Sequence, residues 1–192
     1  MLSIQRERRR FTPEEYLLLE ETSHTRNEYC HGEIFAMTGG TLNHNQIVGN
    51  LYRALSSALE GGPWRVFQSD VRRLVQTHTL FTYPDLIVVC GPLPLMPGRQ
   101  DTLTDARLLI EVLSISTESY DRTDKFRMYR ALSSLKEYVL VAQDRVAVER
   151  HHRLAGGSWE WKEYLSLDDS LELGSLALSL PLSRIYSDLP LT

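Results

Sequence analysis

The sequence has little cysteine and no long apolar run. Its two cysteines, Cys30 and Cys90, lie far apart among 192 residues and fit no metal or redox spacing, so we expect free thiols and a cytoplasmic protein. No apolar stretch approaches the roughly 20 residues that span a bilayer, and no signal-peptide core occurs, so we expect no membrane partner. A Gly-x-Ser-x-Gly motif is also absent, which disfavours a serine hydrolase.

An excess of positive charge is missing as well. The net charge is −4, which argues against a protein that coats nucleic acid without specificity. A local basic groove remains compatible with this balance, and Arg72-Arg73 or the cluster from Arg6 to Arg10 could supply it. Length and composition predict one domain over residues 1–192, with 1–10 as a flexible arm.

The periodicity of apolar residues, together with proline, glycine and capping residues, predicts a mixed α/β order of elements. We expect a sandwich of helices around a mixed sheet. The expected helices are 13–21, 43–59 and 121–132. The expected strands are 28–30, 33–37, 64–69, 71–76, 83–90, 108–113, 137–142, 146–150 and 159–165, followed by a strand or turn and a last helix within 170–189.

Two carboxylates occur where buried strands normally hold only apolar side chains. Asp85 follows Pro84 at the head of the run 86–90, and Glu111 lies inside 108–113. An ionised carboxylate in such a place is costly, so it shifts its pKa or finds a cation. If the two strands are neighbours, both groups meet at one sheet edge, where oxygen ligands suit Mg²⁺ or Mn²⁺. The alternative is that arginine or backbone donors cap each carboxylate.

Lys125 is the candidate cation of the helix that follows Glu111. It shares the apolar side of that helix with Met128 and Tyr129, three and four residues later. Such a lysine either extends to the rim of the protein or reaches a buried anion. Asp121, four residues earlier, could pair with it in a surface ion pair.

Other polar residues have weaker signals. His44 precedes the buried positions Ile47 and Val48 on one helix stripe, so it either serves the site or packs as a core histidine. Asp70 is expected to be a turn acid. The His151-His152 pair has no reliable metal spacing and is expected on a solvated face.

Several short segments occur in an order and at spacings that suggest membership of a protein family. They are Glu28-Tyr29, Gly32-Glu33-Ile34, Ala36-Met37, His44, Tyr83-Pro84-Asp85, Glu111-Val112-Leu113-Ser114 with Thr117, Asp121 and Lys125, then Tyr129, Glu137-Tyr138 and Leu182 to Tyr186. The pair Pro84-Asp85 with Glu111 resembles the signature of the PD-(D/E)XK nuclease superfamily. The wider pattern resembles one branch of it, the Uma-two (Uma2) family of restriction-endonuclease-like proteins.

The resemblance implies a fold and an activity. The fold is a restriction-endonuclease-like mixed β-sheet flanked by helices, with an N-terminal helix and β-hairpin and extra C-terminal strands. The activity is hydrolysis of phosphodiester bonds, in DNA, by an endonuclease that uses Mg²⁺ or Mn²⁺ and works as a homodimer where it cuts both strands.

The same resemblance assigns site residues. Asp85 and Glu111 would bind the metal, and His44 and Glu33 would be accessory. The alternative for Glu33 is a surface charge on the hairpin. The superfamily's usual lysine position is Leu113 here, so Lys125 would take its catalytic role from the next helix. If Lys125 lies outside the site, the protein would instead be a catalytically inactive binding or interaction module on a nuclease fold.

Overall fold

The computed structural model describes residues 9–190 and contains three β-sheets. Most of the expected flexible arm, residues 1–8, lies outside the described residues. The central sheet runs, in spatial order, β11 (Trp159–Tyr164), β10 (Val148–Arg153), β9 (Glu137–Ala142), β8 (Leu108–Leu113), β6 (Leu86–Cys90) and β3 (Trp64–Gln68). The β8–β9 pair is parallel and the others are antiparallel, so the sheet is mixed as expected.

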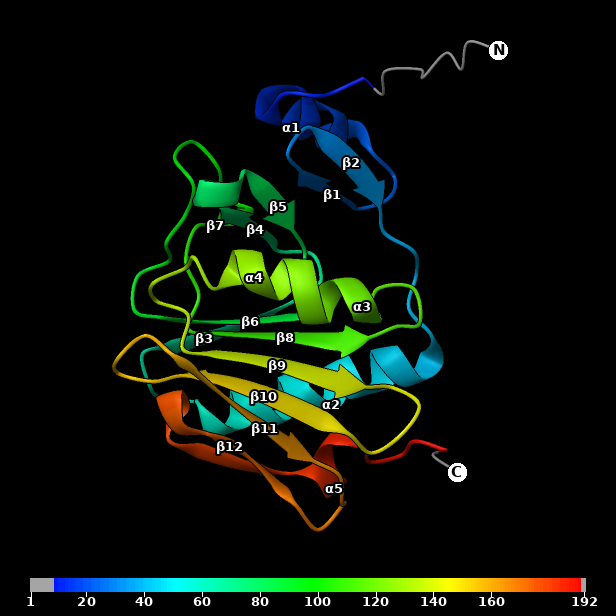
Figure 1. Ribbon diagram of the computed structural model, residues 1–192, viewed down its shortest axis with the longest axis vertical. Coiled ribbons are helices and arrows are strands. Elements are labelled where there is room, and N and C mark those ends of the chain that lie inside the picture. The colour runs from blue at the N-terminus through cyan, green and yellow to red at the C-terminus, as the bar shows by residue number, and fades with distance from the viewer. Residues whose placement is uncertain (1–8, 191–192) are drawn as a thin grey trace.

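The second sheet has five short strands, and a third has two. The five run β2 (Glu33–Ala36), β1 (Asn27–Cys30), β5 (Leu80–Thr82), β4 (Arg72–Val75) and β7 (Thr102–Leu103). The two-stranded sheet pairs β12 (Ser170–Leu173) with β13 (Leu178–Pro181), and α5 (Leu182–Ile185) follows it. Figure 1 shows the five-stranded sheet at the N-terminal end of the molecule and β12 with α5 at the opposite end.

Helices cover both faces of the central sheet. One face packs against α2 (Leu42–Ala58) and the C-terminal elements, through alternate positions such as Ile110 and Val112 of β8. The other face packs against the segment α3 (Glu118–Tyr120) to α4 (Phe126–Tyr129), through Leu109 and Leu113. Because strand side chains alternate, Glu111 shares this second face with Leu109 and Leu113.

A π-helical turn joins α3 to α4. It spans Asp121–Lys125, so the segment expected as one regular helix over 121–132 begins earlier, at Glu118, and its regular part ends at Tyr129. A π turn is rare and is frequently found at functional sites. Both Asp121 and Lys125 are buried within it.

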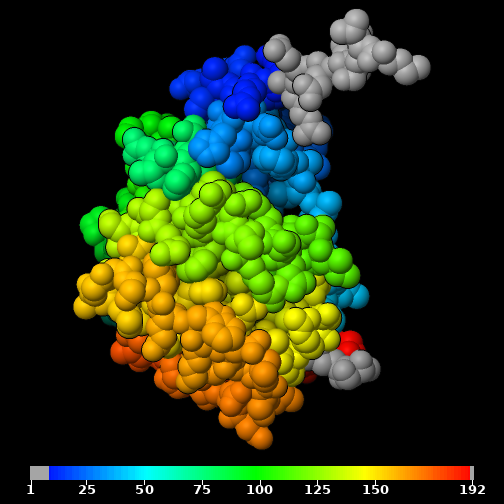
Figure 2. All heavy atoms as spheres, in the orientation of Figure 1, coloured from blue at the N-terminus to red at the C-terminus, as the bar shows by residue number. Residues whose placement is uncertain are grey.

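The N-terminal elements form around a tight hairpin. At its turn, His31 and Gly32 have φ values of 48° and 94°, the left-handed conformation that a two-residue hairpin requires. Helix α1 (Pro13–Thr22) begins where the sequence predicts a helix, and Thr12 and Glu15 form a capping box at its start. Figures 1 and 2 show this hairpin above the α3–α4 segment, and the chain after β2 passes the end of α3 before α2 begins.

The structure also corrects some expected details. Strands β5 and β7 were not expected, and the expected strand 83–90 begins only at Leu86, so Asp85 directly precedes it. Both cysteines are free thiols, as predicted. Across residues 9–190, every helix is too short or too polar to cross a membrane.

Candidate active site

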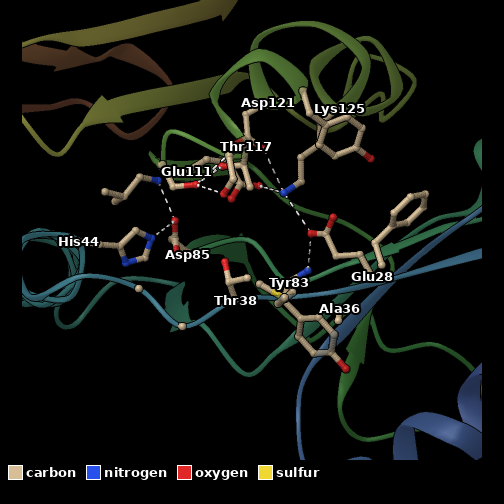
Figure 3. Close-up of a pocket in the computed structure, with 18 of the residues that line it drawn as sticks. Glu28, Ala36, Thr38, His44, Tyr83, Asp85, Glu111, Thr117, Asp121 and Lys125 are labelled. Atoms are coloured by element: carbon tan, nitrogen blue, oxygen red, sulfur yellow. Dashed lines mark hydrogen bonds and ion pairs between the residues drawn. The ribbon is translucent and has the colours of Figure 1, made fainter.

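A cavity of about 490 Å³ lies between the β1–β2 hairpin, the start of α2 and the α3 segment. The chain after β2 and the loop after β8 form its two sides, as Figure 3 shows. Its charged and titratable lining includes Glu28, His44, Asp85, Glu111, Asp121 and Lys125. The structure therefore brings together four of the five residues expected at the site, and Glu33 does not line the cavity.

Asp85 reaches the cavity from the position just before β6. The β6–β8 register pairs Leu86 with Ile110, so Asp85 falls beside Glu111 at the same edge, as expected for neighbouring strands. Its Oδ2 accepts a 2.7 Å hydrogen bond from the backbone N–H of Val112 and lies 3.2 Å from Nε2 of His44. A backbone N–H thus caps Asp85, as in the alternative considered from the sequence. Asp85 nevertheless also lines the cavity.

Glu111 lies on the buried side of the cavity, with only 4% of the residue exposed. Its Oε1 accepts a hydrogen bond from the Tyr129 hydroxyl at 3.1 Å and lies 3.1 Å from Nζ of Lys125. Burial raises the pKa of Glu111 well above its usual value, against the opposing effect of Lys125, and nearby acids raise it further. The carboxylate is thus held in an environment that disfavours its charge.

Lys125 lies among three carboxylates. Its ammonium is 3.1 Å from Glu28 Oε1, 3.1 Å from Glu111 Oε1 and 3.3 Å from Asp121 Oδ1. Burial alone would lower the pKa of Lys125, but the surrounding anions outweigh it and the pKa is raised, so the ammonium is retained. The considered pairing of Lys125 with Asp121 is present, but its expected surface location is wrong, because both side chains are buried.

His44 belongs to the first turn of α2, where Thr41 caps the helix by accepting a hydrogen bond from the His44 N–H. Its ring is partly exposed and contacts Asp85, so it is not a packed core histidine. Burial tends to lower the pKa of His44, but the hydrogen bond and the charge of Asp85 outweigh that effect and raise it.

Glu28 is the residue that the sequence did not single out as a site candidate. Its carboxylate accepts a hydrogen bond from the Thr82 hydroxyl, and its Oε1 lies 3.5 Å from the backbone nitrogen of Tyr83. The hairpin pairs Glu28 with Phe35 and Cys30 with Glu33, so both acids share one strand face. Glu33 lies next to the turn, whereas Glu28 lies at the far end of β1, which borders the cavity.

The remaining candidates lie elsewhere. Asp70 is exposed and pairs with Arg26 at 3.2 Å, which agrees with a turn acid. The expectation of a solvated face for the histidine pair is wrong: the ring of His151 packs 4.2 Å from that of Phe126, and His152 Nδ1 lies 3.3 Å from buried Glu137.

The donor set fits a hard divalent ion only in part. Within residues 9–190, no group of three or more His, Cys, Asp or Glu is arranged to hold a metal. The contacts of Asp85 and Glu111 use Oδ2 and Oε1, and no described residue donates a hydrogen bond to their other oxygens. Two such carboxylate oxygens suit Mg²⁺, which binds through one or two carboxylates and keeps several waters.

Comparisons with known proteins agree with this fold. Two uncharacterized proteins of Synechocystis sp. are similar: slr1290 is 37% identical over 94% of this chain and 93% of its own length, and sll1609 is 29% identical over 87% and 94%. A crystal structure of "a putative nuclease belonging to DUF820" from Anabaena variabilis matches with a TM-score of 0.76 at 18% identity, over 92% of this chain and 98% of that one.

This structural match confirms the restriction-endonuclease-like fold that the sequence resemblance implied. The Uma2 family model, described as "Putative restriction endonuclease", matches residues 13–183, which is most of the chain. The chain therefore belongs to the Uma2 family of restriction-endonuclease-like proteins.

Proposed function

We propose that this protein is a metal-dependent endonuclease that hydrolyses phosphodiester bonds in DNA, with Mg²⁺ or Mn²⁺ as its cofactor. The observation that supports the proposal most directly is the meeting of Asp85, Glu111 and Lys125 at one cavity. Four carboxylates line this cavity against one lysine and one histidine. That excess of negative charge favours a divalent cation.

Each side chain has a part in the proposed reaction. Asp85 and Glu111 would hold the metal, which when bound supplies Lewis acidity and lowers the pKa of a coordinated water. Lys125 stabilises negative charge that develops on the phosphate, because its carboxylate partners keep it as an ammonium. His44 orients Asp85 through the 3.2 Å contact of Nε2 with Oδ2.

Two observations favour a second candidate, the inactive binding module. The ammonium of Lys125 is engaged by three carboxylates, and the described residues offer no group of three metal-binding side chains. A lysine held in this way is less available to a substrate. The two candidates differ in whether metal and DNA binding lead to cleavage.

Calorimetry with Mn²⁺ tests the metal site. We expect binding by the wild type and strongly weakened binding by Asp85→Asn and Glu111→Gln. The control is Asp70→Asn, the same substitution at an exposed acid that does not line the cavity. Binding by both site variants that equals the wild type would show that the metal site is wrong.

Incubation with plasmid, linear duplex and single-stranded DNA, each with Mg²⁺ or Mn²⁺, tests the reaction. We expect cleavage by the wild type and by Asp70→Asn, and none by Glu111→Gln. DNA binding without cleavage in either metal would favour the inactive module. Sedimentation of the same samples, with and without DNA, tests the expected homodimer.

A further inference from the structure

The central sheet ends in β11, whose outer side pairs with no strand of residues 9–190. The four consecutive residues from Glu160 to Glu163 are exposed, and among them Trp161 is 55% exposed. Figure 1 shows β11 on the side of the central sheet away from the β1–β2 hairpin, which borders the candidate site. An exposed edge strand presents unpaired backbone N–H and C=O groups, so it can pair with a strand of another chain.

The backbone groups that β11 directs outward belong to its odd-numbered residues. The Leu154 N–H donates to the Ser158 carbonyl at the turn between β10 and β11, in register with the pairing of these strands. The even-numbered residues of β11 therefore bond to β10, because successive residues of an antiparallel strand direct their N–H and C=O groups to opposite sides. Trp159, Trp161 and Glu163 direct theirs away from β10, so a partner strand must bond to these three residues.

One pairing of β11 with a second copy of itself satisfies both the backbone and the charges. About a two-fold axis at Trp161, antiparallel pairing sets Trp159 opposite Glu163. It also sets Glu160 opposite Lys162, and the symmetry repeats both pairs. The two nearest registers that match the outward groups place Glu160 opposite Glu160 or Lys162 opposite Lys162. Like charges directly opposite destabilise a strand pair, so the register centred on Trp161 is favoured.

The two charged groups of this register are accessible to a partner. The ammonium of Lys162 lies 4.7 Å from the centre of the Tyr164 ring, and no ion pair among residues 9–190 includes it. Glu160 pairs with Arg150 at 2.8 Å, but its side chain is 53% exposed, so a second cation can approach it. The other edge strand of the central sheet, β3, has Arg65 as its single charged residue, so pairing of β3 with its own copy offers no opposite charges.

We infer that two copies of this chain join by antiparallel pairing of β11 with β11, with the two Trp161 residues at the two-fold axis. The inference goes beyond the proposed reaction, because it holds equally for an inactive binding module. The axis is perpendicular to the sheet, so the face that carries Glu111, and with it the candidate site, lies on the same side of the joined sheet in both copies. One strand edge buries less than the roughly 1,200 Å² of a stable interface, so we expect a dissociation constant on the order of 10 µM.

Sedimentation equilibrium of the whole chain at about 1 to 200 µM, without DNA or metal, tests this pairing. We expect a monomer–dimer equilibrium for the wild type. Lys162→Glu sets acids opposite each other and Glu160→Lys sets lysines opposite each other, so each variant alone should dimerise about tenfold more weakly. An equimolar mixture of the two variants restores opposite charges in both pairs, so it should form a heterodimer as tight as the wild-type dimer.

The matched control is Arg65→Glu, a charge reversal at an exposed residue of the other edge strand, which should leave the dimer unchanged. Trp161→Pro tests the backbone without a change of charge. It removes the central outward N–H and no bond between β10 and β11, so it should abolish the dimer. Circular dichroism verifies the fold of each variant. If Glu160→Lys fails to fold because Arg150 loses its partner, Lys162→Glu and Trp161→Pro still decide the outcome.

Three results would overturn the inference. The first is a wild type that stays monomeric at the highest concentration. The second is a dimer that Lys162→Glu and Trp161→Pro leave unchanged, or that Arg65→Glu weakens as much as they do. The third is a mixture of folded Lys162→Glu and Glu160→Lys that stays monomeric, because the register centred on Trp161 requires the two variants to pair.

The outcomes separate this inference from the proposed function. A dimer that depends on Lys162 and Glu160 but cleaves no DNA in either metal would contradict the endonuclease and leave the β11 pairing intact. A monomeric wild type that cleaves DNA would contradict the β11 pairing and leave the endonuclease intact.

Discussion

Two buried polar regions meet at the segment Tyr83 to Asp85, and they differ in charge balance. On one side, the Tyr83 hydroxyl accepts a 2.9 Å hydrogen bond from Arg72 and donates one to Glu20. Arg72 also pairs with Asp101, which Arg99 holds through two hydrogen bonds. We call this group the Tyr83 network. On the other side, two residues later, Asp85 lines the cavity that also contains Lys125 and its three carboxylates.

The difference separates a structural region from a candidate site. In the Tyr83 network, the Tyr83 hydroxyl bridges the almost fully buried Arg72 and Glu20, and Arg72 also pairs with Asp101, so each charged group has a hydrogen-bond or ion-pair partner. Burial raises the pKa of Tyr83 to about 12, with Arg72 opposing the effect, so the hydroxyl remains neutral. Around Lys125, carboxylates outnumber cations and the group opens to a cavity. Unbalanced buried charge beside a cavity is typical of functional sites.

We expect the largest effect on cleavage and stability from removal of the Lys125 ammonium, which tests the difference between the two regions. Lys125→Ala should lower cleavage by about 10²–10³-fold with Mn²⁺ binding retained, and should cost about 3–5 kcal/mol of stability because three buried carboxylates lose their shared cation. Cleavage assays, calorimetry and urea denaturation measure these changes. Unchanged cleavage would contradict the role of Lys125.

A second substitution tests whether the role of Lys125 requires a lysine at that position or only an ammonium close to Glu111. Leu113 lies on the same strand face as Glu111, so Leu113→Lys added to Lys125→Ala should restore part of the activity. Circular dichroism must first show that the double variant folds.

The next effect concerns the Tyr83 network alone. Arg72→Met should lower the free energy of unfolding by about 1–3 kcal/mol, because the buried Tyr83 hydroxyl loses its donor and Asp101 loses one of its two arginine partners. Cleavage per folded molecule should stay within about twofold of the wild type, since Arg72 does not line the cavity. A loss of cleavage as large as that of Lys125→Ala would break the division between the two regions.

A smaller effect separates the two acids of the hairpin. Glu28→Gln should reduce cleavage about tenfold, because Lys125 loses one of its three carboxylate partners. Glu33→Gln is the matched control on the same strand face and should have no measurable effect. Equal activity of the two variants would show that Glu28 has no part in the site.

The smallest effect is the pH dependence of the His44–Asp85 pair. The folded state raises the pKa of His44 above its usual value of 6.5, so the pair stabilises the fold fully below that pH and loses its contribution as the pH rises through the folded pKa. The stability difference between wild type and His44→Gln should therefore be largest at about pH 5.5 and shrink by about pH 8, within about 1 kcal/mol. A difference that grows with pH would contradict the pairing.

Much of the fold follows from sequence periodicity. Strands such as β8 and β9 are continuous apolar runs, and α2 has a regular buried stripe, so their positions are predictable. The buried stripe of α2 departs from a regular period at its end, where Ala58 is exposed and Leu59 is buried. Strands β5 and β7, with three and two residues, are too short to give a pattern, and only pairing with distant strands defines them.

The candidate site is predictable to the extent that it rests on unusual local patterns. Acids inside apolar runs identify Asp85 and Glu111, and helical spacing identifies Lys125 and His44; their roles remain predictions. Glu28 depends on the pairing of β1 with β5, which aligns Tyr29 with Phe81, 52 positions later in the sequence. No local pattern contains that contact, so the sequence could not rank Glu28 above Glu33.

Because of the π-helical turn, the geometry of the candidate site depends on the number of residues in the segment Asp121–Lys125. Each residue of an α-helix advances the helix by about 100°. Loss of one residue within Asp121–Lys125 would let the segment close into regular α-helix and would rotate one flank against the other. Either Lys125 would leave its carboxylates, or Met128 and Tyr129 would leave the core. Relatives that share the site should therefore keep the number of residues between Glu111 and Tyr129, even where they exchange the residues themselves.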